Sequence, residues 1–362
     1  MVYRAIGLMS GSSLDGLDIA FVEFTENAGS WEYQILHAAC YPYESEWKER
    51  LRNAARLSAF EYQQLHADYG HYLGKKVSDF IGEHDLNFRV ALIASHGHTT
   101  FHTPGTMMTA QLGDGAAIAA ETGLPVVTDL RAVDVALGGQ GAPIVPIGER
   151  MLLGDYRYFL NLGGIANISA ASDPYVAFDV SPANRVLNLL AAATGREFDP
   201  DGALAREGLV NHELLERLNG LDYYVRKYPK SLANEFGTDV VYPMILESGC
   251  TTNDCLRTYV EHIAAQLRRS VSSLQPLFPE QKARMLATGG GALNSFLVER
   301  IRDQLADLGV ELVVPGVSLV NYKEAMVMAF IGVLRWRQEN NVLSSVTGAA
   351  RDSVGGAVWS SR

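Results

Sequence analysis

Apolar residues near the start of the chain form short runs separated by polar positions, a pattern typical of strands rather than helices. Residues 5–9 and 19–24 form two such runs and enclose a polar turn of small residues, which predicts a β-hairpin. Residues 33–39 can supply a third strand. Over residues 59–84 the apolar positions change to helical spacing, so we expect a long helix there.

The alternation of strands and helices continues through the next part of the chain. Strands are predicted at 90–94 and 124–128, with a helix over 111–122 between them. A glycine-rich passage at 137–143 can be a hinge or a linker between lobes. Together these features predict an α/β lobe built on a mixed sheet.

After the glycine-rich passage the opening plan of strand, glycine turn and strand is repeated, which predicts a second lobe. The elements expected there are strands at 158–162, 165–169, 175–178 and 285–287, and helices at 183–193, 254–274 and 292–308. We expect the N-terminal lobe to cover residues 1–145 together with a C-terminal segment at about 340–362, and the C-terminal lobe to cover 146–339.

Composition and charge restrict the class of protein. A chain of 362 residues exceeds the usual size of one core, so two lobes are the default. A net charge of −11 argues against a nucleic-acid scaffold. The three cysteines cannot form a disulfide framework, and Cys250 and Cys255 lack the second ligand pair that zinc would need. The N-terminus does not resemble a signal peptide, and the apolar stretch at 325–334 is too short to span a bilayer, so we expect a cytoplasmic protein.

Three glycine-containing turns are the main candidates for chemistry. The first, at 11–18, combines glycines, two hydroxyls and two carboxylates, and either grips a phosphate beside magnesium or is a tight turn capped by its own polar side chains. The others lie at 163–164 and at 289–291, where a strand leads through glycines into a helix. None is a Walker A sequence or a Rossmann fingerprint. The three together nevertheless predict nucleotide binding.

Two lobes with two phosphate-gripping hairpins and a later glycine turn resemble the actin, sugar-kinase and Hsp70 superfamily. Within it the chain is similar to the anhydro-N-acetylmuramic acid kinases, whose G-T-S-x-D-G-x-D block corresponds to residues 11–18. Further matching blocks run in order along nearly the whole chain, at 95–99, 111–115, 129–131, 138–146, 161–168, 178–179, 288–294, 323–325 and 346–349. The resemblance implies a two-lobed, ribonuclease H-like clamshell in which each lobe is a mixed sheet flanked by helices.

The resemblance also implies the reaction. Water opens the 1,6-anhydro bridge of anhydro-N-acetylmuramic acid, and O6 takes the γ-phosphate of ATP, which gives N-acetylmuramic acid 6-phosphate and ADP in peptidoglycan recycling. The expected ligands are therefore ATP, Mg²⁺ and a small sugar, with no nucleic acid and no membrane. The family also implies a homodimer.

For the nucleotide, the resemblance assigns the phosphates to the two hairpin turns and the adenosine to the third glycine turn. Magnesium is expected near Asp15 and Asp18. The phosphate-binding residues are Gly11, Ser12, Ser13, Asp15, Gly16, Asp18, Gly163 and Gly164, and the adenosine-binding residues are Gly289, Gly290 and Gly291.

Two carboxylates are the catalytic candidates. Opening the bridge needs a base that takes a proton from water, and Asp179 is our choice, against the alternative of an N-cap for the following helix. The resemblance implies that Glu324 is a second carboxylate that positions water or magnesium, and the alternative is a first-turn glutamate stabilised by the helix dipole.

The sugar is expected to contact Ser13, Asp15, His98, Arg131 and Asp179. Arg131 suits an anionic sugar substituent, with a surface or interlobe salt bridge as its alternative. His98 belongs to a cluster with His96 and His102, in which hydrogen bonding to the sugar is favoured over metal binding.

The departures from the family pattern concern the sugar. The family's S-H-G-Q-T has His98 in place of glutamine, and its D-T-G-P-G-N is here the segment 179–184, Asp-Val-Ser-Pro-Ala-Asn. The block at 228–231 conforms only in part. These differences keep two alternatives open: a kinase of another anhydro-sugar such as levoglucosan, and a catalytically silent module that senses a sugar or a nucleotide.

Overall fold

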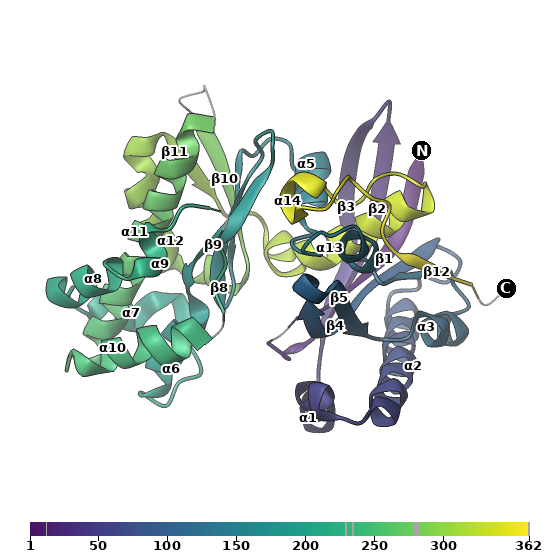
Figure 1. Cartoon of the computed structure of the whole chain (residues 1–362), viewed down its shortest axis with the longest axis horizontal. Helices are drawn as coiled ribbons and strands as arrows, with labels where there is room; N and C mark the ends of the chain where they lie inside the picture. Colours follow the sequence, from purple (N-terminus) through teal and green to yellow (C-terminus); the bar gives the residue numbers. More distant parts are fainter. Residues whose placement is uncertain (12, 229, 234, 278–281, 361–362) are drawn as a thin grey trace. The chain divides into compact units, whose positions relative to one another are not determined.

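A computed structural model gives the fold of residues 1–11, 13–228, 230–233, 235–277 and 282–360. The chain forms two compact units (Figure 1). Unit 1 comprises Met1–Gly154 and Tyr322–Arg362, and unit 2 comprises Asp155–Asn321. The division falls at other positions than the expected 145/146 and 339/340, and its second point lies inside one helix, α13 (Val317–Trp336).

Unit 1 is built on a seven-stranded mixed sheet with the order β12-β6-β4-β1-β2-β3, in which β5 pairs with β4. β1, β2 and β3 are antiparallel neighbours, whereas β1–β4 and β4–β6 are parallel. Its strands are β1 (Val2–Ser10), β2 (Gly16–Asn27), β3 (Ser30–Pro42), β4 (Leu92–Thr103), β5 (Met108–Leu112), β6 (Val126–Thr128) and β12 (Ala357–Trp359). Its other helices are α1 (Ser45–Asn53), α2 (Ala59–Glu83), α3 (Gly115–Thr122), α4 (Ala132–Ala136), α5 (Pro146–Leu152) and α14 (Ser344–Thr347).

The long helix α2 begins and packs as its sequence predicts. Ser58 and Glu61 form a reciprocal capping box at its N-terminus. Its buried face, which includes Tyr69, Leu73 and Val77, packs into the core of unit 1. α2 and α3 lie side by side (Figure 1).

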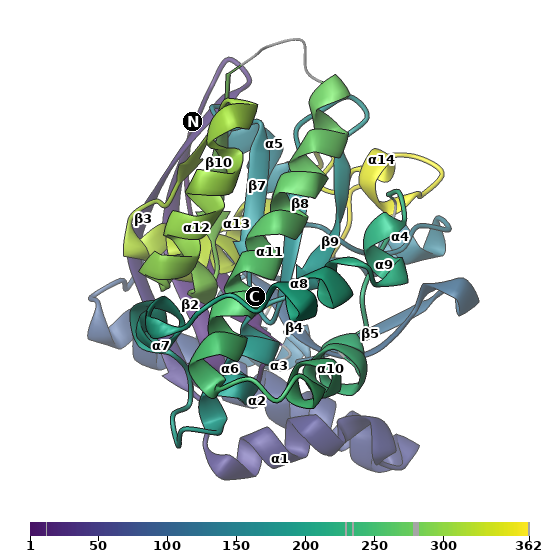
Figure 2. The same ribbon diagram turned by 90° about the vertical axis from the view of Figure 1, so that its left-hand side faces the viewer.

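Unit 2 is built on a five-stranded mixed sheet with the order β11-β10-β7-β8-β9. Its strands are β7 (Tyr158–Leu162), β8 (Ile165–Ala170), β9 (Val176–Pro182), β10 (Ala283–Thr288) and β11 (Val310–Val313). Its helices are α6 (Asn184–Ala192), α7 (Ala203–Glu207), α8 (His212–Asn219), α9 (Asp222–Val225), α10 (Tyr242–Glu247), α11 (Thr252–Leu274) and α12 (Ser295–Leu305). The long helices α11 and α12 cover one face of this sheet (Figure 2).

The two units repeat one strand order. In each, three antiparallel strands (β1-β2-β3 and β7-β8-β9) are followed by two parallel strands beside the first of them (β4-β6 and β10-β11). The expectation of two α/β units, each with a mixed sheet flanked by helices, is confirmed.

Several helix boundaries differ from the sequence predictions because local capping sets them. Gln111 belongs to β5, where it pairs with Thr99, and α3 begins only after Asp114, whose side chain accepts the N–H of Ala116. In the same way α12 begins after Asn294, not at residue 292, because a 3₁₀ turn occupies Gly290–Leu293.

The apolar stretch at 325–334 is the interior of α13, which is longer than expected. With 20 residues and a mean hydropathy of 1.4, this helix is long and apolar enough to cross a membrane. However, 67% of the 18-residue stretch of α13 to which this hydropathy applies is buried inside the structure. Within the helix, Phe330 packs edge-on against Trp31. Burial, rather than short length, indicates that α13 is a core helix.

Candidate active site

The turn between β1 and β2 lies at the end of two central strands of unit 1. Ser10 pairs with Leu17, and the N–H of Leu14 donates to the carbonyl oxygen of Gly11 at 3.3 Å. Leu14 adopts a left-handed φ of 59°, and its side chain is buried in the core of unit 1. Because a left-handed non-glycine residue is costly, this buried side chain holds the turn in one conformation.

The residues of this turn differ in their exposure to solvent. Ser13 and Asp15 are exposed, as a ligand would require, while Ser12 lies outside the described residues. Gly16 is buried, and a Cβ there would lie 2.6 Å from the carbonyl oxygen of Tyr41. Close approach of β3 therefore explains Gly16 without a phosphate contact.

Asp18, in β2, is the electrostatic centre of this region. The pKa of Asp18 is raised to about 6, mainly by burial and also by the charges of Glu324 and Asp15, against a hydrogen bond from the Cys40 thiol that lowers it. The structure thus brings together three predicted carboxylates of unit 1. The negative charges of Asp15 and Glu324 favour the protonated form of the Asp18 carboxyl group.

Glu324 lies well inside α13, which begins at Val317, and so it is not a first-turn glutamate stabilised by the helix dipole. The backbone beside it touches β1 directly, because a Cβ on Gly7 would overlap the carbonyl oxygen of Ala325. This contact fixes the position of Glu324 relative to the strand that leads into the first turn.

A buried ion pair anchors the same stretch of α13. Lys323 Nζ lies 2.8 Å from Glu149 Oε1 of α5, and the two side chains are only 5% and 4% exposed. Pairs this deeply buried hold their elements in one arrangement, because neither charge can be left alone without a large cost.

Arg131 is held inside unit 1. Its Nε donates to His96 Nε2 at 2.8 Å and its Nη1 donates to the carbonyl oxygen of Gly141 at 2.6 Å, whereas Nη2 makes no hydrogen bond to a described residue. Burial lowers the pKa of Arg131 to about 10, and Glu324 and Asp134 partly offset this. Within unit 1 the arginine therefore pairs with a histidine and a backbone carbonyl, and not with a carboxylate at the surface of that unit.

Asp134 fixes the glycine-rich passage that the sequence suggests as a hinge. This fully buried residue accepts the Gly141 N–H at 2.7 Å and the Thr347 hydroxyl at 2.6 Å. Since Gly141 also accepts from Arg131, one carboxylate ties the passage, α14 and Arg131 together.

His98 belongs to a buried hydrogen-bond network that runs beneath the first turn. Its Nδ1 lies 3.1 Å from Ser10 Oγ, Tyr43 donates to Ser10 at 2.8 Å, and Tyr43 and Tyr69 share a bond of 2.5 Å. Burial lowers the pKa of His98 to about 4. His98 is therefore a neutral hydrogen-bonding group at neutral pH.

This depressed pKa predicts a pH-dependent difference between wild type and His98→Gln. An unfolded-state histidine titrates near about 6.5, so below that pH the unfolded wild type binds a proton that the folded protein refuses. Down to a pH of about 4, wild type should lose about 1.4 kcal/mol relative to the variant for each pH unit. Urea denaturation of both proteins at several pH values measures this, and a difference independent of pH would contradict it.

The three histidines of the cluster have separate partners. His96 accepts from Arg131, His98 bonds Ser10, and His102 Nδ1 lies 3.1 Å from Thr109 Oγ1. Within the described ranges, no group of three or more His, Cys, Asp or Glu side chains is arranged to hold a metal ion. A metal bound by the histidines is therefore not supported.

In unit 2 the second glycine turn, between β7 and β8, is held by α6. The carbonyl oxygen of Gly163 accepts the N–H of Asn184, and that of Gly164 accepts the N–H groups of Ala183 and Arg185. The N–H groups of both glycines make no hydrogen bond to a described residue. A turn with occupied carbonyls and free N–H groups is suited to an anion.

The third glycine turn lies against the second. A Cβ on Gly289 would overlap Asn161 Oδ1, and one on Gly291 would lie 2.9 Å from Asn184 Oδ1. Asn184 also donates to the carbonyl oxygen of Leu162 at 2.9 Å. The structure therefore brings together both predicted nucleotide-binding turns of this unit.

Asp179 is a half-buried residue of β9 whose carboxyl group has one oxygen available. Oδ2 accepts the N–H of Leu232 at 2.8 Å, and Oδ1 makes no hydrogen bond to a described residue. Burial raises the pKa of Asp179, while the bond from Leu232 opposes the shift. The Tyr223 hydroxyl donates to its backbone carbonyl at 2.7 Å.

Two sequence expectations about Asp179 are wrong in their local structure. β9 does not end before Asp179 but continues to Pro182, and Asp179 pairs with Asn167 inside the sheet. The residue that precedes α6 is Ala183, so Asp179 does not cap that helix. Extension of the strand through the unusual segment 179–182 removes the capping alternative.

Sequence reasoning missed the residues that hold the candidates in place. Asn184 joins two glycine turns, and Tyr223 and Leu232 hold Asp179, while Tyr43 supports the histidine network. For Asn184 a signal existed, since it is the one residue after Pro182 that keeps the family's pattern. Tyr43, Tyr223 and Leu232 carry no motif that could have indicated them.

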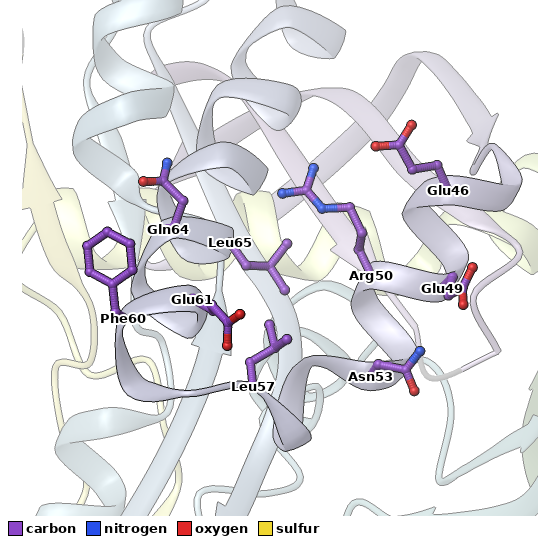
Figure 3. Close-up of a pocket in the computed structure, with 9 residues that line it drawn as sticks. All are labelled: Glu46, Glu49, Arg50, Asn53, Leu57, Phe60, Glu61, Gln64 and Leu65. Carbon is purple, nitrogen blue, oxygen red and sulfur yellow. The ribbon is translucent and has the colours of Figure 1, made fainter.

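The pocket drawn in Figure 3 is a separate feature of unit 1. It has a volume of about 450 Å³ and lies between α1 and α2, where Arg50 and Leu57 face Leu65 (Figure 3). None of its lining residues is a predicted site residue. The residues that line it are Glu46, Glu49, Arg50, Asn53, Leu57, Phe60, Glu61, Gln64 and Leu65.

Comparisons with known proteins agree over nearly the whole chain. The model of the family "Anhydro-N-acetylmuramic acid kinase" matches residues 3–361. The kinase of that name from Paramagnetospirillum magneticum is 33% identical over 97% of this chain and 98% of its own length. The one from Sulfurimonas denitrificans is 32% identical over 98% of each chain. A solved structure, component A of (R)-2-hydroxyglutaryl-CoA dehydratase from Acidaminococcus fermentans, covers 90% of this chain and 96% of its own at 12% identity, with a TM-score of 0.45.

Proposed function

Because the chain belongs to the anhydro-N-acetylmuramic acid kinase family, it is an ATP-dependent carbohydrate kinase, and we propose that Asp179 is its catalytic base. The reaction opens the 1,6-anhydro ring of anhydro-N-acetylmuramic acid with water and phosphorylates O6, which yields N-acetylmuramic acid 6-phosphate and ADP. A levoglucosan kinase and a silent sensing module are not favoured, since the matched relatives carry one kinase name over almost their full length.

The hydrogen bonding and pKa of the Asp179 carboxyl group are the main support for its role as the base. A base must be ionised, fixed in position and open to water on one side. The Leu232 N–H holds Oδ2, which leaves Oδ1 to accept a proton from the attacking water. The raised pKa increases its strength as a base compared with an exposed aspartate.

The proton and the phosphoryl group move in a balanced way. Water loses a proton to Asp179 as its oxygen bonds C1, and the bond between C1 and O6 breaks. O6 keeps the electron pair and attacks the γ-phosphorus, so that ADP leaves. No separate acid is needed, because the phosphoryl group takes up the charge that develops on O6.

We assign the nucleotide phosphates to both hairpin turns. In unit 2 the free N–H groups of Gly163 and Gly164 support this assignment, and the adjacent turn at Gly289–Gly291 is assigned to adenosine. In unit 1 the assigned residues are Gly11, Ser12, Ser13, Asp15 and Asp18, while Gly16 allows the close approach of β3.

Magnesium is assigned to Asp15 and Asp18. Their carboxylates fit the ion, because Mg²⁺ is usually held by one or two carboxylates together with water and phosphate oxygens. Burial and, after it, repulsion by Glu324 and Asp15 raise the pKa of Asp18, and a bound cation would stabilise its ionised form against both effects. When bound, the ion would neutralise charge on the phosphates.

Replacing Asp18 by asparagine should therefore raise the Mg²⁺ concentration needed for half-maximal turnover by about 10-fold or more. The amide keeps the size of the side chain but removes its charge. Titration of activity with Mg²⁺ at saturating ATP measures the effect, and Asp79→Asn, at an exposed position of α2, is a control away from every assigned residue. An unchanged Mg²⁺ requirement would contradict the assignment.

For the sugar we assign Arg131, His98, Ser13 and Asp15 in unit 1, with Glu324 as a second carboxylate that positions water or magnesium. The unpaired Nη2 of Arg131 supports a contact with an anionic sugar substituent. We also assign a cytoplasmic homodimer, and the family resemblance supports this. The net charge of −11 supports a protein that does not bind nucleic acid. The burial of α13 supports one that does not insert into a membrane.

The test is an assay with ATP and either anhydro-N-acetylmuramic acid or levoglucosan in ¹⁸O-labelled water. We expect a 6-phosphorylated product labelled at C1 with the first sugar only. Turnover of levoglucosan alone would move the chain to the alternative substrate, and ATP binding without turnover of either sugar would support the sensing module.

A further inference from the structure

Arg185 lies beside the second glycine turn in the first turn of α6. Its backbone N–H donates to the carbonyl oxygen of Gly164 at 3.3 Å. A Cβ placed on Gly164 would lie 3.9 Å from both Cβ and Nε of Arg185, so the side chain runs along the turn. Arg185 therefore both fixes the turn through its backbone and places its side chain beside it.

Arg185 has no carboxylate partner among the described residues, and it is the arginine of unit 2 whose Nε is buried without a hydrogen-bond partner among them. A buried N–H of a charged group without a partner is costly, which makes it a candidate for binding a ligand. Ion pairs hold most of the other arginines, namely Arg206, Arg217, Arg257, Arg268, Arg284 and Arg300.

Two further unpartnered polar atoms lie in the same part of unit 2. The buried hydroxyls of Ser181 and Thr288 make no hydrogen bond within the part of the chain that the structure describes. Thr288 directly precedes the third glycine turn, and Ser181 pairs with Ala166 at the start of β8. Unsatisfied polar atoms therefore gather around the two turns whose N–H groups are suited to an anion.

We propose that Arg185 binds a phosphate oxygen of the nucleotide at the Gly163–Gly164 turn. The inference rests on the proposed function and adds to it a residue that no motif of the sequence indicated. The carbonyls of this turn are occupied by α6, so the turn offers only N–H donors, and a guanidinium group beside them adds charge and further donors. An anion with several oxygens can bond both groups at once.

Isothermal titration of wild type and Arg185→Met with ADP and with adenosine tests the proposal without a sugar. Loss of a charge-assisted contact should weaken ADP binding by about 10-fold or more and leave adenosine binding unchanged. Arg185→Lys, which keeps the charge but loses the planar fork, should lie between the two. Arg196→Met is the matched control, because this exposed arginine follows the same helix.

Equal ADP affinity in wild type and a folded Arg185→Met would overturn the proposal. So would a variant with unchanged ADP affinity and a raised KM for the sugar, since Arg185 would then bind a substituent of the sugar. A parallel loss of ADP and adenosine affinity would show a merely structural role and also overturn it. These outcomes do not depend on turnover, so they are distinct from a failure of wild type to phosphorylate the anhydro-sugar.

Discussion

Replacement of Asp179 by asparagine should lower kcat by at least about 100-fold, because the amide cannot take a proton from the attacking water. The amide oxygen can still accept the N–H of Leu232, so the local structure should persist. ADP affinity should stay within about twofold of wild type, since the nucleotide-binding turns do not depend on the charge. Single-turnover kinetics and calorimetry measure the two quantities.

The pH profile provides an independent check on Asp179. The raised pKa places the acid limb of kcat/KM at a higher pH than an exposed aspartate would, and turnover falls as the pH drops through that limb because the base becomes protonated. Asp222→Asn, in the exposed first turn of α9, is the matched control and should keep wild-type kinetics. Near wild-type activity of Asp179→Asn would exclude the residue as the base.

Glu149→Leu should lower the free energy of unfolding by about 3–5 kcal/mol, because it leaves the Lys323 ammonium buried without its partner. The double variant Glu149→Leu/Lys323→Met should recover most of this loss, since it removes both charges. Denaturant unfolding of the wild type, the two single variants and the double variant measures the coupling between the residues. Additive losses in the double variant would show that the two side chains are energetically independent.

Much of the fold followed from periodicity. The hairpin at the N-terminus, the long helices α2 and α11, and the repeat of strand, turn and strand were predicted because their apolar positions keep a strict spacing. Boundaries were less predictable where capping decided them. Asp114 and Asn294 are the N-caps of α3 and α12, so both helices begin later in the sequence than the apolar pattern alone predicts.

The candidate site was predictable only for residues inside motifs. The spacing of glycines and carboxylates in the turns indicated that they could bind phosphate and a metal ion. The groups that hold these residues in place act through tertiary contacts, which the sequence does not show. Leu232 bonds Asp179 with its backbone, which no side-chain pattern can reveal. Arg185 was equally hidden, because only the structure shows that its Nε has no partner.

The repeated strand order of the two units is the trace that duplication of an ancestral gene would leave. The first turns of the two units nevertheless differ in their polar residues. In unit 1 the second strand carries Asp18 opposite Met9, whereas in unit 2 it carries Asn167 opposite Asn161. At these matching positions the second strand of unit 1 carries a carboxylate and that of unit 2 a neutral amide, so one repeated hairpin presents a different charge in each unit.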